Sequence, residues 1–467
     1  MKTAALNNKD ILSHKLRFEA EHYLNDNSFL CLALERNKDN CDTLENLATV
    51  FNPPVFKRQF CKPTSKSVQY FQSSDVQNAE EFSPVHIFKG QAESLNLLVN
   101  KGDVLVTGFG TIGNTRLVSK HQDGVCYANN VCRIRTNSNI PNGFIYAFMT
   151  SKYGYAQLNN NASGSVVRYI EAPGIKRTLV PRVPESFQKE VDDLIQESAR
   201  LREEATVALN KASELLKQYA SLSDLTESDY DYYGPHSSER KVSYFIRSRK
   251  EIDSTTINAF NHSERIRNTK DKIKCKTKPL KEIILNGDTF STGSFPRVEV
   301  KEGKGIMLIN QSDIFDSIIK GKYISKRNVK LSNLVEYGEV LIAGVGTMGE
   351  NETFCRTIFA NEDLVGQLVS GEFIRMKTND KVPSGYLYTW LSSDYGFRLI
   401  RNLQTGTKLC RPIPRLVLEI PVPIIETEQM VEIDKLVKEA HSKKYRANCL
   451  ERKAITMIEQ EIEKWNN

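Results

Sequence analysis

The chain lacks the sequence features of a membrane or secreted protein. Its 467 residues contain no apolar run of about 18 residues, the length that a membrane-spanning helix needs. The polar stretch 1–15 has no apolar signal-peptide core. The nine cysteines are scattered and form no CxxC pair, which favours reduced thiols over disulfides or structural zinc. We therefore expect a cytoplasmic protein.

Familiar catalytic motifs are also missing. The sequence has no GxxxxGK[ST] phosphate loop, no HExxH metal motif and no credible nucleophile triad. Two segments fit GxGxxG, Gly108–Gly113 and Gly344–Gly349. A dinucleotide fold requires a helix after the third glycine, but Asn114–Lys120 has strand character, so we predict tight turns between strands.

One further motif is a candidate for a catalytic site. Asn52-Pro-Pro-Val55 resembles the NPP[YF] motif of amino-methyltransferases. Only 51 residues precede it, the aromatic residue is missing and no second copy exists, so we interpret it as a loop. The sequence therefore predicts no catalytic residue and no metal ligand.

The composition is that of a globular protein with two or three domains. Apolar residues make up 40% and charged residues 26% of the chain. The net charge of +7 permits nucleic-acid binding but does not require it.

Two long charged stretches, Phe187–Tyr219 and Ile433–Trp465, carry a narrow seam of apolar and small residues. The seam recurs at alternating steps of four and three without Pro or Gly, which is the pattern of a coiled coil. A single such helix cannot bury its own stripe, so we expect the two to pair as an antiparallel coiled coil; the alternative is two unrelated surface helices. The predicted seam residues are Val191, Leu194, Leu201, Leu215, Ile433, Leu436, Leu450 and Met457.

The repeat extends far beyond these stretches, which indicates a duplicated unit. The matching pairs are Gly102–Gly113 with Gly338–Gly349, Ser67–Val76 with Gly305–Ile314, Pro141–Tyr146 with Pro383–Tyr388, Ser151–Tyr155 with Ser393–Phe397, Ala162–Gly164 with Gln404–Gly406, and the proline-rich exits Val180–Pro184 and Ile420–Pro423. We expect two globules of one kind, each followed by its helix. The predicted divisions are 1–184, a helix at 185–220, a connector at 221–256, a second globule at 257–424 and a second helix at 425–467.

Each globule shows mixed secondary-structure signals. Short β-rich runs after a glycine and alternating apolar and polar residues predict strands, whereas two apolar runs after Pro predict short helices. The predicted strands are Val104–Thr107, Cys126–Arg135, Val340–Ala343 and Glu372–Lys377, and the predicted helices are Phe144–Met149 and Tyr386–Ser392. The fold class that follows is α+β, with a mixed, curved sheet in each globule.

Basic residues gather in Gly- and Ser-rich loops just outside the predicted strands. Lys and Arg contact phosphate, and Arg also reads base edges, so these residues are candidates for DNA binding. For any single one, the alternative is an ordinary solvated charge. The candidates are Lys57, Arg58, Lys62, Lys66, Arg116, Lys120, Arg168, Arg297, Lys301, Lys304, Lys320, Lys322, Lys326, Arg327, Lys408 and Arg411.

The ordered, duplicated pattern resembles the specificity subunit of type I restriction–modification enzymes over about residues 15–465. The residues that carry the resemblance are the opening Arg17–Tyr23 with its weak echo Asn258–Asn261, the GD/EVL segments at 102–113 and 338–349, the Ile420–Pro423 exit and the Glu428-Gln429 opening of the second helix. The first helix opens Ser186-Phe-Gln188 instead, and the first exit is less tight, so docking of partners need not be equal on the two sides.

The resemblance implies a function as well as a fold. In that family each globule is a target-recognition domain that reads half of a split DNA site, and the paired helices act as a ruler between the halves. The implied partners are double-stranded DNA, methyltransferase subunits and a restriction subunit. The implied chain binds no cofactor, while S-adenosylmethionine, ATP and Mg belong to the partners. Two other readings stay open: a solitary DNA-binding or scaffold protein of a defence system, and an enzyme with an unrecognised site.

Overall fold

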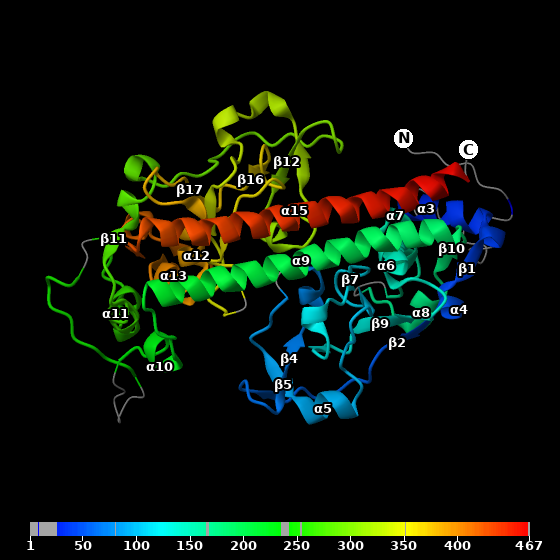
Figure 1. The fold of residues 1–467 in the computed structure, drawn as a ribbon, viewed down its shortest axis with the longest axis horizontal. Helices are drawn as coiled ribbons and strands as arrows, with labels where there is room; N and C mark the ends of the chain where they lie inside the picture. Colours follow the sequence, from blue (N-terminus) through cyan, green and yellow to red (C-terminus); the bar gives the residue numbers. More distant parts are fainter. Residues whose placement is uncertain are drawn as a thin grey trace. The chain divides into compact units, whose positions relative to one another are not determined.

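The computed structural model describes residues 8, 26–79, 81–164, 168–234, 242–252, 255–350 and 352–465, so the Arg17–Tyr23 segment lies outside the described residues. Two compact units make up the chain (Figure 1). Unit 1 comprises Met1–Glu203 and Arg446–Asn467, and unit 2 comprises Glu204–Tyr445. The long helices α9 (Glu185–Tyr219) and α15 (Thr427–Lys464) therefore each contribute one part to each unit.

Unit 1 is an α+β globule built on two four-stranded open sheets. Its helices are α3 (Asp26–Arg36), α4 (Leu44–Leu47), α5 (Lys89–Ser94), α6 (Asn142–Thr150), α7 (Lys152–Asn160) and α8 (Ala172–Lys176), with 3-10 turns η1 (Lys38–Asn40), η2 (Ser73–Gln77) and η3 (Lys120–Gln122). Its strands are β1 (Cys41–Thr43), β2 (Ala48–Phe51), β3 (Phe60–Cys61), β4 (Ser67–Phe71), β5 (His86–Phe88), β6 (Val104–Thr107), β7 (Thr115–Leu117), β8 (Cys126–Tyr127), β9 (Val131–Thr136) and β10 (Leu179–Pro181).

The two sheets of unit 1 have different roles. The sheet β2-β9-β6-β7 is antiparallel, and its apolar strands lie in one core cluster with α6 and α7. The sheet β3-β5-β4-β8 is mixed, because β4 pairs parallel with β8 and antiparallel with β5. We call residues 52–101 the outer lobe of unit 1, since they form most of this second sheet. The strands β1 and β10 pair where the chain enters and leaves the globule.

Unit 2 repeats the architecture with smaller sheets. Its helices are α10 (Glu227–Tyr230), α11 (Glu264–Asp271), α12 (Ser384–Ser392), α13 (Asp394–Arg401) and α14 (Pro414–Val417), with 3-10 turns η4 (Ala259–His262), η5 (Leu280–Glu282), η6 (Leu285–Gly287), η7 (Asp313–Phe315), η8 (Lys326–Asn328) and η9 (Leu331–Asn333). Its strands are β11 (Thr277–Pro279), β12 (Ile306–Ile309), β13 (Lys322–Ile324), β14 (Val340–Ala343), β15 (Thr357–Phe359), β16 (Leu368–Val369), β17 (Phe373–Met376), β18 (Gln404–Thr405), β19 (Arg411–Pro412) and β20 (Pro421–Pro423).

The pairing of the strands follows the same order in both units. The antiparallel sheet β15-β14-β17 matches β7-β6-β9 of unit 1. In the mixed sheet β13-β12-β16, the parallel pair β12 and β16 matches the parallel pair β4 and β8. The strand β11 pairs with β20 as β1 does with β10. The helix α3 packs on α7 and α11 packs on α13. We call residues 294–330 the outer lobe of unit 2, because they form most of its mixed sheet.

The repeated Ser-x-Tyr-Gly motif explains a pair of sharp helix junctions. The hydroxyls of Ser151 and Ser393 cap α7 and α13 by accepting from the backbone N–H groups of Gly154 and Gly396. A Cβ on Gly154 would lie 2.3 Å from the carbonyl oxygen of Phe148. A Cβ on Gly396 would lie 2.3 Å from the carbonyl oxygen of Trp390, so neither position has room for a side chain.

The repeated Pro-x-Gly motif anchors each globule to the long helix that follows it. The backbone N–H of Gly143 donates to Asp192 Oδ1 of α9 at 2.8 Å. The backbone N–H of Gly385 donates to Asp434 Oδ1 of α15 at the same distance. These aspartates satisfy a free N–H in the first turn of α6 and of α12, a favourable place for a negative charge.

The long helices pack against each other in antiparallel orientation. In unit 2, Tyr219 Oη donates to Glu432 Oε2 at 2.7 Å, and Lys443 Nζ lies 3.1 Å from Glu204 Oε2. In unit 1, Ser198 Oγ donates to the carbonyl oxygen of Ala447 at 2.9 Å. Residue numbers rise along one helix as they fall along the other, so the antiparallel pairing predicted from the sequence is confirmed.

The predicted seam describes only part of the buried surface of the helices. Val191, Leu201, Leu215 and Ile433 are buried, and Leu194, Leu436, Leu450 and Met457 are half-buried. Each helix also buries a second stripe against a globule, which in unit 1 includes Ile195, Ile458 and Ile462. One face therefore meets the partner helix and a neighbouring face completes a globular core.

The α+β fold class with two similar globules and two long helices is confirmed. The strands at Val104–Thr107 and Val340–Ala343 have the predicted bounds. The single strand predicted at Cys126–Arg135 is wrong, because it is divided between β8 and β9 by a turn. The predicted connector is part of unit 2, where Tyr395 Oη donates to the carbonyl oxygen of Ser223 at 2.8 Å and Asp229 pairs with Lys272.

Candidate nucleic-acid interface

All of the candidate cations except Arg116 have exposed side chains, so they are placed where a polyanion could reach them. In unit 1, Lys57, Arg58, Lys62 and Lys66 lie on the outer lobe around β3 and before β4. No Asp or Glu occurs between Asn46 and Ser74, so this segment carries positive charge without carboxylates of its own. Such a segment attracts phosphate.

Aromatic side chains lie between these cations. The guanidinium of Arg58 lies 5.7 Å from the centroid of the Tyr70 ring, which itself contacts Phe60 edge-on. Phe60 is 58% exposed and Phe88, on β5, is 48% exposed. Apolar side chains beside cations suit contacts with base edges such as the thymine methyl group.

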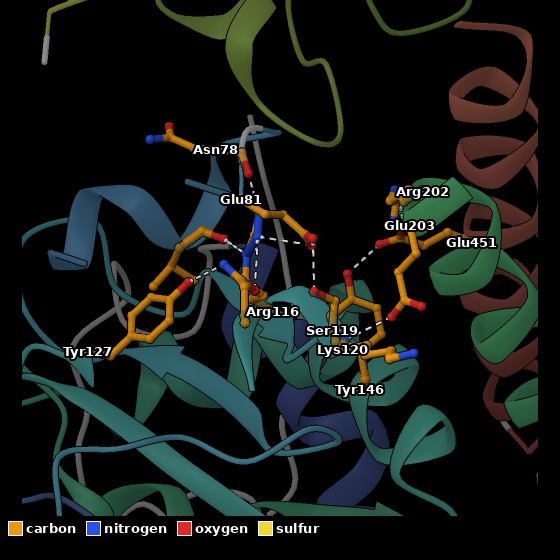
Figure 2. Close-up of polar contacts among 12 residues, drawn as sticks. Asn78, Glu81, Arg116, Ser119, Lys120, Tyr127, Tyr146, Arg202, Glu203 and Glu451 are labelled. Carbon is orange, nitrogen blue, oxygen red and sulfur yellow. Dashed lines mark hydrogen bonds and ion pairs between the residues drawn. The ribbon is translucent and has the colours of Figure 1, made fainter. Parts of the chain in front are cut away.

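Arg116 is a correction to the sequence-based assignment. Its side chain is buried, and its guanidinium donates to the carbonyl oxygen of Asn78 (Figure 2). The guanidinium also donates to the carbonyl oxygen of Val76 and to Gln122 Oε1. Glu81 lies 3.9 Å away as its ion-pair partner. Arg116 therefore braces the segment after β4 against β7, and it is removed from the proposed DNA surface. A lone basic residue in a short strand carries no signal of the face on which it lies.

The other two candidates of unit 1 lie apart from the outer lobe. Lys120 begins η3, and its side chain is exposed while its backbone N–H donates to Glu203 of α9. Arg168 donates to the carbonyl oxygen of Asn159 and precedes Tyr169, whose ring stacks on Phe109 at 5.6 Å.

Strand pairing in unit 2 brings two basic segments together. The backbone N–H of Val300 donates to the carbonyl oxygen of Tyr323, and that of Ser325 donates to Val298. The segment with Arg297, Lys301 and Lys304 therefore runs alongside the segment with Lys322, Lys326 and Arg327. Lys322 forms an ion pair with Glu299 in which both side chains are exposed, a contact of little energetic weight. Lys408 and Arg411 lie on the separate β18–β19 hairpin.

The two GxGxxG segments lie in loops between antiparallel strands. Val104 pairs with Leu117 across the first loop, and Val340 pairs with Phe359 across the second. The loops therefore lack the βαβ context of a dinucleotide site. Asn52 likewise holds a loop, since its Oδ1 accepts from the backbone N–H of Ala172 and its Nδ2 donates to the carbonyl oxygen of Asn129.

Three of the described cysteines have buried thiols that are poor nucleophiles. Burial raises the pKa of Cys31, Cys126 and Cys132 to about 12 in each case, so these thiols stay protonated at neutral pH. Across the described part of the chain, no three His, Cys, Asp or Glu side chains gather as metal ligands would. The described helices include none with the length and apolar character to span a membrane.

Sequence reasoning missed two strand arginines that each bind the acid of a GD/EVL segment. Arg375 forms a bidentate ion pair with Glu339, and the two side chains are 0% and 1% exposed. In unit 1 the acid of the matching GD/EVL segment, Asp103, pairs with Arg135 at 2.9 Å. The signal available in the sequence was the acid that precedes Val-Leu in both halves, Asp103 and Glu339.

No protein-family model matches the chain, and no curated protein matches its sequence. Solved structures do match over most of its length. They include the type I restriction–modification specificity subunit of M. genitalium, at 11% identity over 91% of this chain and 95% of that chain, with a TM-score of 0.36. They also include the HsdS subunit of Thermoanaerobacter tengcongensis, at 14% identity over 90% and 95%, with a TM-score of 0.28. A chain from a study of complex assembly and conformational transition in the type I system matches at 16% identity over 90% and 97%, with a TM-score of 0.28.

Proposed function

We propose that this chain is the DNA-specificity subunit of a type I restriction–modification complex. The observation that carries the proposal is the duplication itself. Both units keep the same scaffold contacts, from Gly143 on Asp192 to Gly385 on Asp434, while their outer lobes differ in sequence and charge. A protein with one scaffold and two different reading surfaces suits a target with two different half-sites.

Each outer lobe supplies the chemistry for one half-site. Lysines such as Lys66 and Lys326 contact phosphate as point charges, which gives affinity without base preference. Arginines such as Arg58 and Arg327 carry a planar fork that fits the O6 and N7 atoms of guanine. Because the two lobes differ, the expected target is bipartite and asymmetric.

The reactions belong to partner subunits in this proposal. Methyltransferase subunits bring S-adenosylmethionine, and a restriction subunit brings ATP and Mg. The chain itself contributes sequence recognition and a docking frame. We expect the protein to act, with its partners, in the cytoplasm.

Co-expression with the genes that flank it tests the function. We expect the chain to co-purify with a methyltransferase, and the complex to methylate duplex DNA at one bipartite sequence. Purified alone, the chain should transfer no methyl group. A chain that stays alone in the presence of these partners would favour the solitary scaffold reading, and methylation by the isolated chain would favour an unrecognised enzyme.

A further inference from the structure

The loop after β7 links helix α9 to the outer lobe of unit 1 through two polar contacts. The backbone N–H of Lys120, in the loop after β7, donates to Glu203 Oε1 at 2.8 Å (Figure 2). Next to it, the buried hydroxyl of Ser119 donates to Glu81 Oε2 at 2.8 Å. Glu203 is half-buried, so its carboxylate can be replaced without opening the core.

This contact is linked to the cation-bearing sheet through a short chain of side chains. Glu81 pairs with Arg116, and Arg116 holds the carbonyl oxygens of Val76 and Asn78 at the end of η2. The turn η2 follows β4, the strand that begins just after Lys66. If the loop at Lys120 shifted, the sheet that carries the candidate cations would therefore shift with it.

Helix α9 is itself held firmly at this point. Arg202, the residue before Glu203, pairs with Glu451 of α15, and Glu451 accepts a hydrogen bond from Tyr146 Oη of α6. Glu451 is 1% exposed. Burial and the neighbouring Glu451 raise the pKa of Tyr146, so its phenol stays protonated and donates. The buried carboxylate of Glu451 keeps both Arg202 and Tyr146 as partners, because breaking a buried ion pair costs several kcal/mol.

Unit 2 makes the corresponding joint with different chemistry. There the end of β15 meets α15 through the ring of Phe359, which lies 4.9 Å from the ring of His441. The side chain of Asn361 donates to the carbonyl oxygen of His441 at 3.3 Å. These groups are buried, and the residue of α15 that matches Glu203 in the repeat is Tyr445 rather than an acid. The carboxylate joint is a feature of unit 1.

We propose that Glu203 is a positioning residue that fixes the angle of the unit 1 lobe on α9 and so narrows the spacer length that the protein accepts between its half-sites. The inference rests on the proposed function. Each base pair added to a spacer moves a half-site by about 3.4 Å and turns it by about 35°. A lobe held at one angle rejects such a change, whereas a lobe that tilts accommodates it.

A selection experiment on the assembled complex tests this role. In this experiment, the complex of the full chain with its methyltransferase partners selects binding sites from a library of DNA duplexes whose central sequence is fully randomised. We expect wild type to choose one spacer. Glu203→Ala should keep both half-sites but lose about tenfold in discrimination against spacers one base pair shorter or longer, the size of one hydrogen bond to a charged group.

Two matched variants separate positioning from general damage. Glu203→Gln keeps an oxygen that accepts from Lys120 and should behave as wild type. Glu190→Ala removes an exposed acid from the same helix and should also change nothing. Hydrogen exchange at the Lys120 amide should quicken in Glu203→Ala alone.

The outcomes distinguish this inference from the function on which it rests. If wild type selects a bipartite site and Glu203→Ala selects it with equally strict spacing, the positioning role is overturned while the function stands. If Glu203→Gln relaxes the spacing as much as Glu203→Ala, the hydrogen bond is not the cause. If wild type selects no bipartite site, the proposed function fails.

Discussion

At the scale of single residues, each unit buries one strand arginine but binds its guanidinium with different partners. Arg133 and Arg375 occupy matching places opposite Leu105 and Leu341, and neither is exposed. Arg133 donates to four backbone carbonyls, and burial lowers its pKa to about 10, which leaves it charged at neutral pH. Arg375 has a carboxylate partner instead, so the stability of unit 2 depends more on one acid.

Replacing Glu339, the acid that pairs with Arg375, should show how much the stability of unit 2 depends on it. Glu339→Gln leaves Arg375 buried without a counter-charge, and we expect a loss of about 3 kcal/mol in the free energy of unfolding, measured by urea denaturation. Asp103→Asn is the control, because Arg135 is one-third exposed and water compensates its charge. The double variant Glu339→Leu with Arg375→Met should recover most of the loss, and a double variant as unstable as the single one would contradict the argument.

Surface cations should behave in the opposite way, with little effect on stability. Lys326→Ala removes one proposed phosphate contact, so the slope of log K against log salt should fall by about 0.9 for every DNA sequence alike. Lys281→Ala, which removes an exposed cation paired with Glu419 outside the outer lobes, is the control and should leave the slope unchanged. A change in base preference rather than slope would place Lys326 at a base.

At the scale of elements, the helix junctions depend on close approach of the backbone. Gly154→Ala would place a Cβ 2.3 Å from the carbonyl oxygen of Phe148, a contact that only a backbone shift relieves. We expect a loss of about 1–3 kcal/mol in the free energy of unfolding. Gly90→Ala is the matched control, because nothing lies within 4 Å of the new Cβ in helix α5, and it should be neutral or slightly stabilising. Equal effects of the two variants would mean that close packing is not the reason for the glycine.

The long helices allow a second test at this scale. Inserting Ala-Glu-Ala-Lys after Ala208 lengthens α9 by about 6 Å, close to two base pairs of DNA. The four residues turn the helix by about 400°, so the seam returns to its face within about 40° and the pair should still form. The recognised spacer should grow by one or two base pairs with both half-sites unchanged, as methylated-base sequencing would show.

The same four residues inserted after Asn139, an exposed loop residue outside the helices, provide the control. That variant should keep the original spacer. A folded helix insertion that also keeps the original spacer would mean that the helices are a docking surface rather than a ruler.

At the scale of the whole molecule, the duplication makes the two halves of the target separable. Exchanging residues 25–180 for another recognition globule should change one half-site and leave the other as it was. The long helices and unit 2 stay untouched by this exchange, so the spacer should stay as well. Sequencing of methylated DNA from cells that carry the chimera checks this, and a change in both halves or in neither would contradict the duplication.

The sequence by itself determined the repeat, the α+β fold class and the two long helices with an apolar seam. These features follow from local periodicity and from motifs that recur in the same order in both halves, and the structure explains several of them. The glycines of Pro-x-Gly and Ser-x-Tyr-Gly recur because Asp192, Asp434 and the preceding helices leave no space for a Cβ. Local steric requirements of this kind are visible in a single sequence as glycines that recur at matching positions.

Only the tertiary structure decided which cations face solvent and which residues join the lobes to the helices. Arg116 and Lys120 are both basic residues in short elements, yet one is buried beneath Glu81 and the other is exposed beside Glu203. The second buried stripe of α9 and α15 was likewise invisible in the seam pattern. Burial depends on contacts between residues that are distant along the chain, such as Tyr146 and Glu451, and no local pattern encodes those contacts.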